Sequence, residues 1–454
     1  MHSAKLTMTK YLPVLFVACG LQLVANAQEN SPYSRYGLGD ITPNHNILSR
    51  AMGGIAAGMD DYQSVIKSIN FTNPASLGNN YNTIFDLGAE TDIRALKTAS
   101  PPEKFTSVNA LFSYMQLGFP LATKKMRANG MNWAMSFGLR PVSRIDYNIE
   151  KRERLPGVDS LQTLYQGSGG ANQFFFGTGF QIKAGTDKKI SNFNFGFNVG
   201  YVFGTKDYST RLTFMNDTVQ YYRSNSADSA HFGGLFVSGG VQYETSFKSG
   251  ILRFGIYGSI QQRLNASRDI TRETFSVDAN GSPYRVDSIF DQKNIKGVIV
   301  LPGTIAAGFS YQDKHWLYGA DFEFTNWTNY SYYRQSDDVQ NAWVARIGAQ
   351  YFPAKENTSS KKYFSFVRYR AGAYYGPDYI KINANRPNYG ITFGTGMPLT
   401  SIRRLSYNGE YVVLNTAVEI GGRGDKNSNL RENTLRFSVG ISMNAGWFQK
   451  HKYY

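Results

Sequence analysis

The chain has 454 residues, enough for two average domains or for one large β-architecture. It contains 31 Tyr, 31 Phe and 45 Gly at a mean hydropathy of −0.37, and its aromatic residues stand at alternate positions rather than in continuous apolar runs. A formal net charge of +15 raises the question of nucleic-acid binding. The basic residues form no single patch and an exported chain rarely meets nucleic acid, so we predict no nucleic-acid partner.

Residues 1–27 have the pattern of a secretory signal peptide. Lys5 and Lys10 precede an apolar stretch, and Ala25-Asn26-Ala27 forms a small-residue cleavage site. Lipoprotein processing at Cys19 is the alternative, but it leaves much of the apolar stretch on the mature chain. Cleavage after Ala27 removes the only cysteine, which excludes disulfides and thiol chemistry, and leaves 46 basic and 33 acidic residues.

Residues 28–80 lack a period-2 pattern and are rich in Gly, Asn, Ser and Pro. We therefore expect an irregular or partly helical N-terminal segment. From residue 82 onward polar and apolar residues alternate, which predicts β-strands. No run of 18 apolar residues follows the signal, so a membrane-spanning helix is not expected there.

The alternating segments number 14, each about as long as the 9–11 residues that a strand needs to cross a bilayer, or longer. They lie within 82–93, 105–121, 132–149, 172–182, 192–204, 232–247, 251–265, 298–312, 316–332, 341–353, 363–376, 387–399, 405–421 and 433–448.

The last segment shows the pattern most clearly. In residues 435–448 the odd positions are apolar, as at Phe437 and Ile441, and the even positions are polar or small, as at Ser438 and Ser442. We predict that the apolar face meets lipid and that the polar face lines the inside of a barrel.

The connections predict an orientation. Those at 151–167, 209–229 and 267–296 are long, whereas those on the opposite side are short, as expected for outer loops and periplasmic turns. The six short turns hold twelve basic and three acidic residues. We expect this basic rim to meet anionic lipid head groups, with a dedicated partner site as the alternative.

These patterns predict an all-β protein, a 14-stranded antiparallel transmembrane β-barrel. In lipid every backbone polar group must be paired within the protein, which for strands requires a closed barrel. A barrel of this size leaves a lumen, for which residues 28–80 are the natural plug. Tryptophans near strand ends suit interfacial girdles. They are Trp133, Trp316, Trp327, Trp343 and Trp447.

The order of several short motifs resembles the FadL/TodX family of outer-membrane transporters, in the form common in Bacteroidetes. They are SPYSRYGLGD (31–40), RAMGGIAAGMDD (50–61), NPASLG (73–78), GLRPVSRIDY (138–147), GSGGANQFFFGTGF (167–180), LPGTIAAGFSYQ (301–312) and ADFEFTNWTNY (320–330). After the signal peptide at 1–27, the resemblance implies an N-terminal hatch at 28–80 and a 14-stranded barrel at 81–454. It also implies uptake of hydrophobic molecules such as long-chain fatty acids, with a lateral exit at a kink in the third strand.

Pro141 lies inside that third strand. Proline cannot donate to a β-ladder, so we expect a bulge or gap there, lined by Gly138 and Arg140, unless Pro141 simply ends the strand near the rim. In the hatch, the resemblance assigns Asn73, Pro74 and Ala75 to the turn before the first strand, although an ordinary Asn-Pro turn has the same pattern. Gly53 and Gly54 allow close packing against the wall or form a flexible loop.

No pair among the five histidines has metal-ligand spacing and no nucleophile motif accompanies them, so we predict no enzyme, no cofactor and no metal site. The function predicted first is passive uptake of a hydrophobic small-molecule ligand across the Gram-negative outer membrane, with outer-membrane lipid around the barrel. The alternative is an accessory or shuttle subunit of an outer-membrane protein secretion or assembly complex, which implies a protein partner. An open porin or an adhesin is a third class.

Overall fold

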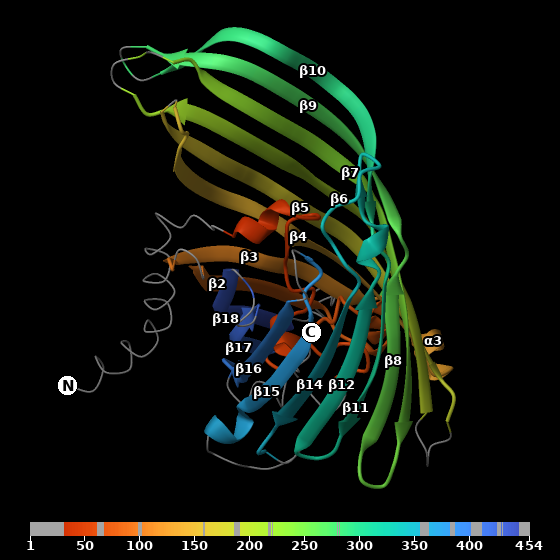
Figure 1. Cartoon of the computed structure of the whole chain (residues 1–454). Coiled ribbons are helices and arrows are strands. Elements are labelled where there is room, and N and C mark those ends of the chain that lie inside the picture. Colours follow the sequence, from red (N-terminus) through yellow and green to blue (C-terminus); the bar gives the residue numbers. More distant parts are fainter. Residues whose placement is uncertain are drawn as a thin grey trace, which may run out of the picture.

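The computed structural model describes residues 31–60, 68–98, 102–157, 159–185, 191–216, 219, 221–278, 280, 282–354, 363–381, 386–400, 411–424, 428 and 430–444. Within these ranges the chain forms a closed 14-strand antiparallel barrel, which confirms the predicted fold class (Figure 1). Two of the fourteen strands are each interrupted once, and their halves carry separate labels: β8 with β9, and β10 with β11.

The strands are β1 Asp40–Ile41, β2 Ile84–Thr98, β3 Lys104–Pro120, β4 Met131–Arg154, β5 Ser160–Lys183, β6 Ser191–Phe214, β7 Arg223–Ser246, β8 Ile251–Ser259, β9 Gln262–Val277, β10 Pro283–Leu301, β11 Thr304–Gln312, β12 Trp316–Thr325, β13 Ser331–Tyr332, β14 Ala342–Tyr351, β15 Arg368–Pro377, β16 Pro387–Pro398, β17 Tyr411–Arg423 and β18 Leu430–Asn444. The helical turns are η1 Pro32–Arg35, α2 Ile47–Arg50, η2 Pro74–Asn79, α3 Lys124–Ala128, η3 Trp327–Asn329 and η4 Tyr363–Phe366. No helix in the described ranges is both long and apolar enough to cross a membrane.

The barrel closes where β18 pairs with β2 along the full length of both strands. In β18 the odd-numbered Phe437 and Val439 are 42% and 43% exposed, whereas the even-numbered Ser438 and Ser442 are buried. The apolar face of this strand therefore points away from the barrel and the polar face points inward, as the alternation predicts.

Strands β4, β5, β6, β7, β9 and β10 extend beyond the other strands of the barrel (Figure 1). β4, β5, β6 and β7 each have 24 residues, whereas β12, β14 and β15 each have 10. The strand registers define a common level through residues 143, 171, 204, 232, 266 and 297. We call the sheet beyond this level the wing. It comprises residues 143–154, 160–171, 204–214, 223–232, 266–277 and 283–297.

The wing corrects one expectation. The segments 151–167, 209–229 and 267–296 were expected as long loops, but most of their residues belong to strands, and the true connections are 155–159, 215–222 and 278–282. The prediction was wrong because both faces of a sheet beyond the barrel rim carry polar side chains, and a strand of this kind has no period-2 apolar signal.

The outward apolar face ends at the base of the wing. On β8 and β11, Phe254, Ile256 and Ile305 are 50%, 49% and 59% exposed. The next outward positions, Arg263 and Asn265 on β9, are polar and exposed. The apolar belt on these strands is therefore confined to the short strands β8 and β11, each of nine residues.

The tryptophans divide between two environments. Trp316 and Trp343 stand at strand ends and are 39% and 36% exposed, as a girdle requires. Trp327 instead lies buried in η3, so the girdle assignment was wrong for this residue. Trp447 lies outside the described residues.

The N-terminal segment, residues 31–60 and 68–80, packs against the inward face of the strands. Its irregular backbone leaves carbonyl groups that need donors once buried. Wall side chains supply them. Gln116, Asn132, Asn198 and Gln242 donate to the carbonyl oxygens of Ile69, Gly78, Phe71 and Ala57 at 2.9, 2.8, 3.2 and 2.8 Å. Part of the polar inward face therefore forms hydrogen bonds with the N-terminal segment instead of with water.

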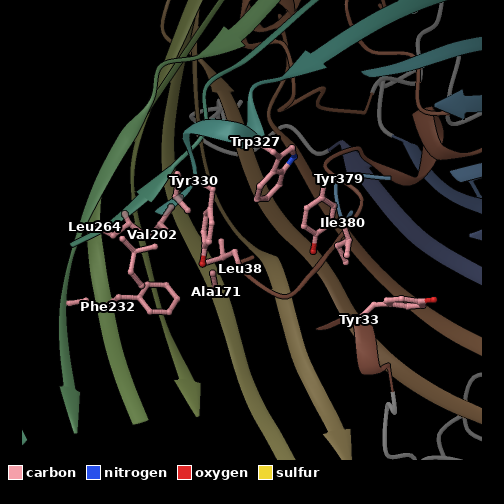
Figure 2. Packing of buried hydrophobic residues seen from close by; sticks show 13 residues of the cluster. Tyr33, Leu38, Ala171, Val202, Phe232, Leu264, Trp327, Tyr330, Tyr379 and Ile380 are labelled. Atoms are coloured by element: carbon pink, nitrogen blue, oxygen red, sulfur yellow. The ribbon is translucent and has the colours of Figure 1, made fainter. Parts of the chain in front are cut away.

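The largest buried apolar cluster joins three parts of the chain (Figure 2). Tyr33 and Leu38 come from the N-terminal segment, and Trp327 and Tyr379 come from connections between strands. The wall contributes Ala171, Val202, Phe232 and Leu264. The cluster fixes the start of the N-terminal segment at the base of the wing.

Candidate functional site: an interior cavity beside a gap in the wall

β3 and β4 are hydrogen-bonded over only part of their length. Their ladder runs from Pro120 opposite Ala134 to Met115 opposite Leu139, and stops there. Beyond that point residues 104–114 of β3 pair with β2 alone, and residues 140–154 of β4 pair with β5. The two strand edges therefore part, and the described wall has a gap between them.

The gap begins at Pro141. In the ladder with β5, Pro141 lies opposite Asn172 and Ser143 lies opposite Ala171, so Val142 is an extra, bulged residue. Gly138 lies in the last part of the β3–β4 ladder, where an added Cβ would be 2.8 Å from the carbonyl oxygen of Met115. Pro141 therefore interrupts β4 in mid-strand rather than ending it at the rim.

The N-terminal segment occupies the free edge of β4 at this point. β1 pairs with β4 antiparallel, Asp40 opposite Arg144 and Ile41 opposite Ser143. The Thr42 hydroxyl donates to the carbonyl oxygen of Pro141 at 2.8 Å. Over two residues, β1 thus takes the place beside β4 that β3 leaves empty.

A cavity of about 370 Å³ lies behind the gap, within the volume range of small-molecule sites. Its apolar lining includes Leu38, Phe71, Phe175, Phe236 and Trp327. Its cationic lining consists of Arg50, Arg94, Arg140, Arg346, Arg423 and Arg436. The cavity therefore offers an apolar surface and positive charge together.

Most of these arginines are neutralised by carboxylates. Arg50 pairs with Glu90, and Arg346 pairs with Glu323 at 3.2 Å. Arg94 and Arg423 share Asp40, and Arg436 contacts Glu419 and Asp92 at 3.1 and 3.3 Å. Within the low-dielectric interior such pairing is what makes a buried guanidinium tolerable.

Arg140 differs from the others. Its guanidinium donates to the Gln173 side-chain oxygen at 2.9 and 2.6 Å and stacks over the Phe71 ring at 5.3 Å. In the described part of the chain it has no acidic partner. It is the cavity arginine that stands next to Pro141, and so at the edge of the gap.

His45 shares this side of the cavity. Burial lowers the pKa of His45 well below its usual value, and Arg346, Arg50 and Arg140 add to the effect. The imidazole is therefore neutral at physiological pH, and its buried Nε2 has no partner among the described residues. Arg140 is thus accompanied by a neutral histidine and other cations, an arrangement that favours an anionic group.

The two predicted hatch glycines pack against β14, β15 and β16, and Gly54 also lies beside His45. Gly53 has φ +71°, donates its N–H to the Thr392 hydroxyl at 2.8 Å, and leaves 2.6 Å between an added Cβ and the carbonyl oxygen of Ile347. Gly54 has φ +85° and contacts Arg346. Both positions require glycine, because of their left-handed conformation and, at Gly53, the close approach to backbone.

The Asn73-Pro74-Ala75 turn begins η2. The Asn73 side chain accepts from the Ala75 N–H at 3.1 Å and donates to the carbonyl oxygen of Ala57 at 2.7 Å, and Pro74 takes the first helical position. These contacts anchor the turn to an earlier part of the same segment. The predicted hatch residues therefore lie in two places, Gly53 and Gly54 against β14 to β16, and the Asn73–Ala75 turn against β5 to β7.

Sequence reasoning missed the carboxylates that hold the segment in place. Asp321 on β12 accepts from the N–H groups of both Ala56 and Ala57, at 2.5 and 2.7 Å. Glu90 on β2 binds Arg50. A charge on an inward strand position was the available signal, because such a charge at mid-strand needs a buried partner. In the described residues no group of three or more His, Cys, Asp or Glu is placed to hold a metal ion.

Comparison with known proteins gives a family and a fold. A sequence profile of the BamG family matches residues 8–454. No curated protein matches the chain. Among solved structures, the chain is similar to the P. putida toluene transporter TodX, at 14% identity and TM-score 0.52, over 90% of this chain and 100% of that one. It is also similar to a Pseudomonas aeruginosa FadL homologue, at 11% identity and TM-score 0.52, over 89% and 99%. The resemblance to FadL and TodX thus holds for the fold, while the family that matches is a different one.

Proposed function

This chain belongs to the BamG family, and we propose that it is an outer-membrane channel that takes up hydrophobic small molecules, such as long-chain fatty acids, by passive diffusion. The observation that carries the proposal is the position of the cavity, which lies directly behind the gap between β3 and β4. A ligand leaving the cavity there passes between the strand edges at the base of the wing, next to the rim of the apolar belt, without crossing the rest of the polar lumen.

The outward surface supports a membrane location. The exposed apolar side chains of β8, β11 and β18 form a belt, and a bilayer is the solvent that such a belt requires. The proposed signal peptide at 1–27, whose residues lie outside the described ranges, supplies the export route. Lipid also explains the exposed Lys124, Lys125 and Arg127 of α3, which suit the anionic head groups at the rim.

We assign residues 28–80 the role of a plug, followed by the barrel from residue 81. The support is the set of hydrogen bonds from wall amides and from Asp321 to the segment's backbone. Gly53, Gly54, Asn73, Pro74 and Ala75 hold it in place, and Gly138, Arg140 and Pro141 form the lateral gate.

The cavity favours an amphiphile over a purely apolar ligand. Arg140 is the cavity cation without a carboxylate partner in the described chain, and a fatty-acid carboxylate fills that role. The apolar lining from Phe71, Phe175 and Phe236 then receives the acyl chain. No enzymatic step, cofactor, metal or nucleic acid has a part in the proposal.

Binding of lauric acid to the purified protein in detergent tests the proposal. We expect wild type to bind laurate and Arg140→Gln to bind it several-fold more weakly, because the carboxylate loses its charge partner. Arg140→Lys is the matched control, since it keeps the charge and loses the planar fork. Naphthalene binding should be equal in all three. Equal laurate binding in wild type and Arg140→Gln would contradict the assignment.

A second candidate function is that of an accessory subunit in an outer-membrane secretion or assembly complex. Exposed apolar side chains on the wing and its connections favour it. Tyr222, Tyr284 and Ile289 are 63%, 53% and 74% exposed, although they lie beyond the apolar belt. Mass spectrometry of mildly solubilised membranes separates the two candidates. A co-extracted fatty acid supports uptake, and a protein in fixed stoichiometry supports the accessory role.

A further inference from the structure

The side chain of Arg144 bridges the gap between β3 and β4. Arg144 lies on β4 opposite Asp40 of β1, and its Nη2 donates to the backbone carbonyl oxygen of Phe112 on β3 at 2.9 Å. Its Nη1 donates to Glu90 on β2 at 3.1 Å. One guanidinium therefore joins the two strand edges that the ladder leaves apart.

Glu90 is the centre of this bridge. Its carboxylate is 1% exposed and is held on three sides, by Arg144, by the Ser113 hydroxyl at 2.9 Å, and by Arg50 of α2. Arg144 belongs to β4, Ser113 to β3 and Arg50 to the N-terminal segment. The three elements that surround the gap thus meet at one buried carboxylate.

Arg50 connects this centre to the cavity. It lines the cavity and fixes the backbone around it, donating to the carbonyl oxygens of His45 and Pro43 at 2.8 and 3.1 Å. Arg50 therefore joins the N-terminal segment to the same carboxylate that Arg144 contacts across the gap.

We propose that Arg144 and Glu90 form a latch that holds the lateral gap closed, and that Arg50 transmits the position of the N-terminal segment to it. The proposal rests on the proposed lateral exit, and adds a positioning pair that controls its width. When the segment shifts around a bound ligand, Arg50 withdraws from Glu90, Arg144 loses its anchor, and the edges of β3 and β4 separate.

Spin-label distances test the latch without reference to transport. Ala110→Cys on β3 and Asn148→Cys on β4 place nitroxides at exposed positions on either side of the gap. Phe437→Cys on β18 with Ala110→Cys is the control pair, because both residues pair with Thr91 of β2. We expect Arg144→Gln and Glu90→Gln to lengthen and broaden the distance across the gap and to leave the control pair unchanged.

Arg144→Lys is the matched variant. Lysine keeps the charge but lacks the fork that reaches Glu90 and Phe112 together, so we expect a distribution between those of wild type and Arg144→Gln. Identical distributions across the gap in wild type and Arg144→Gln would overturn the latch. A change in the control pair as well would also overturn it, because the bridge would then be general support for the barrel.

Transfer of lauric acid from liposomes that carry each variant tests the latch and the lateral exit separately. A wider gap with several-fold faster transfer supports both the latch and the lateral exit. A wider gap with unchanged transfer supports the latch and overturns the lateral exit as the route. An unchanged gap with active transfer overturns the latch alone.

Discussion

Glycines on the inner face of the wall allow the N-terminal segment to lie against the strands. At Gly196 of β6 an added Cβ would stand 2.4 Å from the carbonyl oxygen of Pro74 and 2.8 Å from the N–H nitrogen of Ala75. These are backbone atoms, which cannot yield as a flexible side chain does. We predict that Gly196→Ala displaces η2 and lowers stability by about 1–3 kcal/mol. Limited proteolysis of the segment and heat-dependent gel mobility measure the two effects.

Gly239, on the neighbouring strand β7, provides the control for that prediction. An added Cβ there meets only the carbonyl oxygen of Gly196, at the ordinary distance of 3.6 Å. Gly239→Ala should leave both proteolysis and gel mobility as in wild type. Equal behaviour of the two variants would mean that the close approach at Gly196 does not hold the segment.

Asp40 ties β1 to the wall through Arg94 and Arg423, with an Asp40–Arg423 distance of 2.6 Å. Asp40→Asn removes the carboxylate and leaves two buried guanidinium groups with less compensation. Breaking a buried ion pair in this way costs about 3–5 kcal/mol. We therefore predict release of β1 from β4, which protease cleavage near residue 40 detects. A variant that stays as resistant as wild type would contradict this role.

The same ion pairs set the response to acid. Burial acts to raise the pKa of Asp40, but Arg423 and Arg94 outweigh it, so the net shift is below the usual value of 3.8. A carboxyl with a lowered folded-state pKa stabilises the docked segment above its unfolded pKa, and this stabilisation is lost as the pH falls through the folded value. We predict that β1 stays protected from pH 7 to about pH 4 and becomes cleavable only below it. Pepsin digestion at stepped pH from about pH 5 to about pH 2 measures this, with an unfolded protein substrate at each step to correct for the activity of pepsin itself.

At the residue scale, the sequence predicts the features that follow from the backbone chemistry of a single residue type. Pro141 indicates an interrupted ladder because proline lacks an N–H, and Gly53 and Gly54 indicate close approach because they lack a Cβ. It does not predict the partners of Glu90 or Asp40. Arg144 and Arg423 are far from them along the chain, and only the closed barrel brings these charges together.

A single bulge in β4 distinguishes this strand from a regular β-strand. Val142 is the extra residue between Pro141 and Ser143, and the ladder with β5 is in step on both sides of it. Deleting Val142 restores a continuous ladder and straightens β4 toward β3. We predict a barrel of unchanged heat resistance with slower laurate transfer. Faster or equal transfer would show that the bulge does not widen the gap.

At the element scale, the alternation locates every strand of the belt, since lipid on one face and polar groups on the other produce a period of two. It fails on the wing. The β9–β10 ladder continues from Gln262 opposite Leu301 to Val277 opposite Pro283, with three bulges in β10. Residues on this hairpin meet water on both sides, and the bulges move side chains out of step with any fixed period.

The whole molecule combines a belt that crosses the bilayer with a wing that stands outside it, and the two have different requirements. The belt needs closure, because unpaired backbone is not tolerated in lipid. The wing has free edges, since residues 283–298 of β10 pair only with β9 in the described chain. Unpaired edges of this kind are stable in water. On the β10 edge, the charged residues Arg285, Asp287 and Asp291 disfavour pairing with a strand of another chain.

Shortening the wing separates uptake from any role in a complex. Arg268 lies opposite Ile295, so an Asn-Gly turn in place of residues 269–294 joins β9 to β10 at a paired position and suits a two-residue hairpin. The cavity, the gap and the apolar belt lie below the deletion. We therefore predict unchanged heat resistance and unchanged laurate transfer in liposomes, because neither depends on the hairpin. If the exposed Ile289 and Tyr284 serve a partner protein, the shortened chain loses that protein on mild solubilisation while full-length chain retains it. Loss of laurate transfer from a barrel that is still heat-resistant would instead place part of the uptake route in the wing.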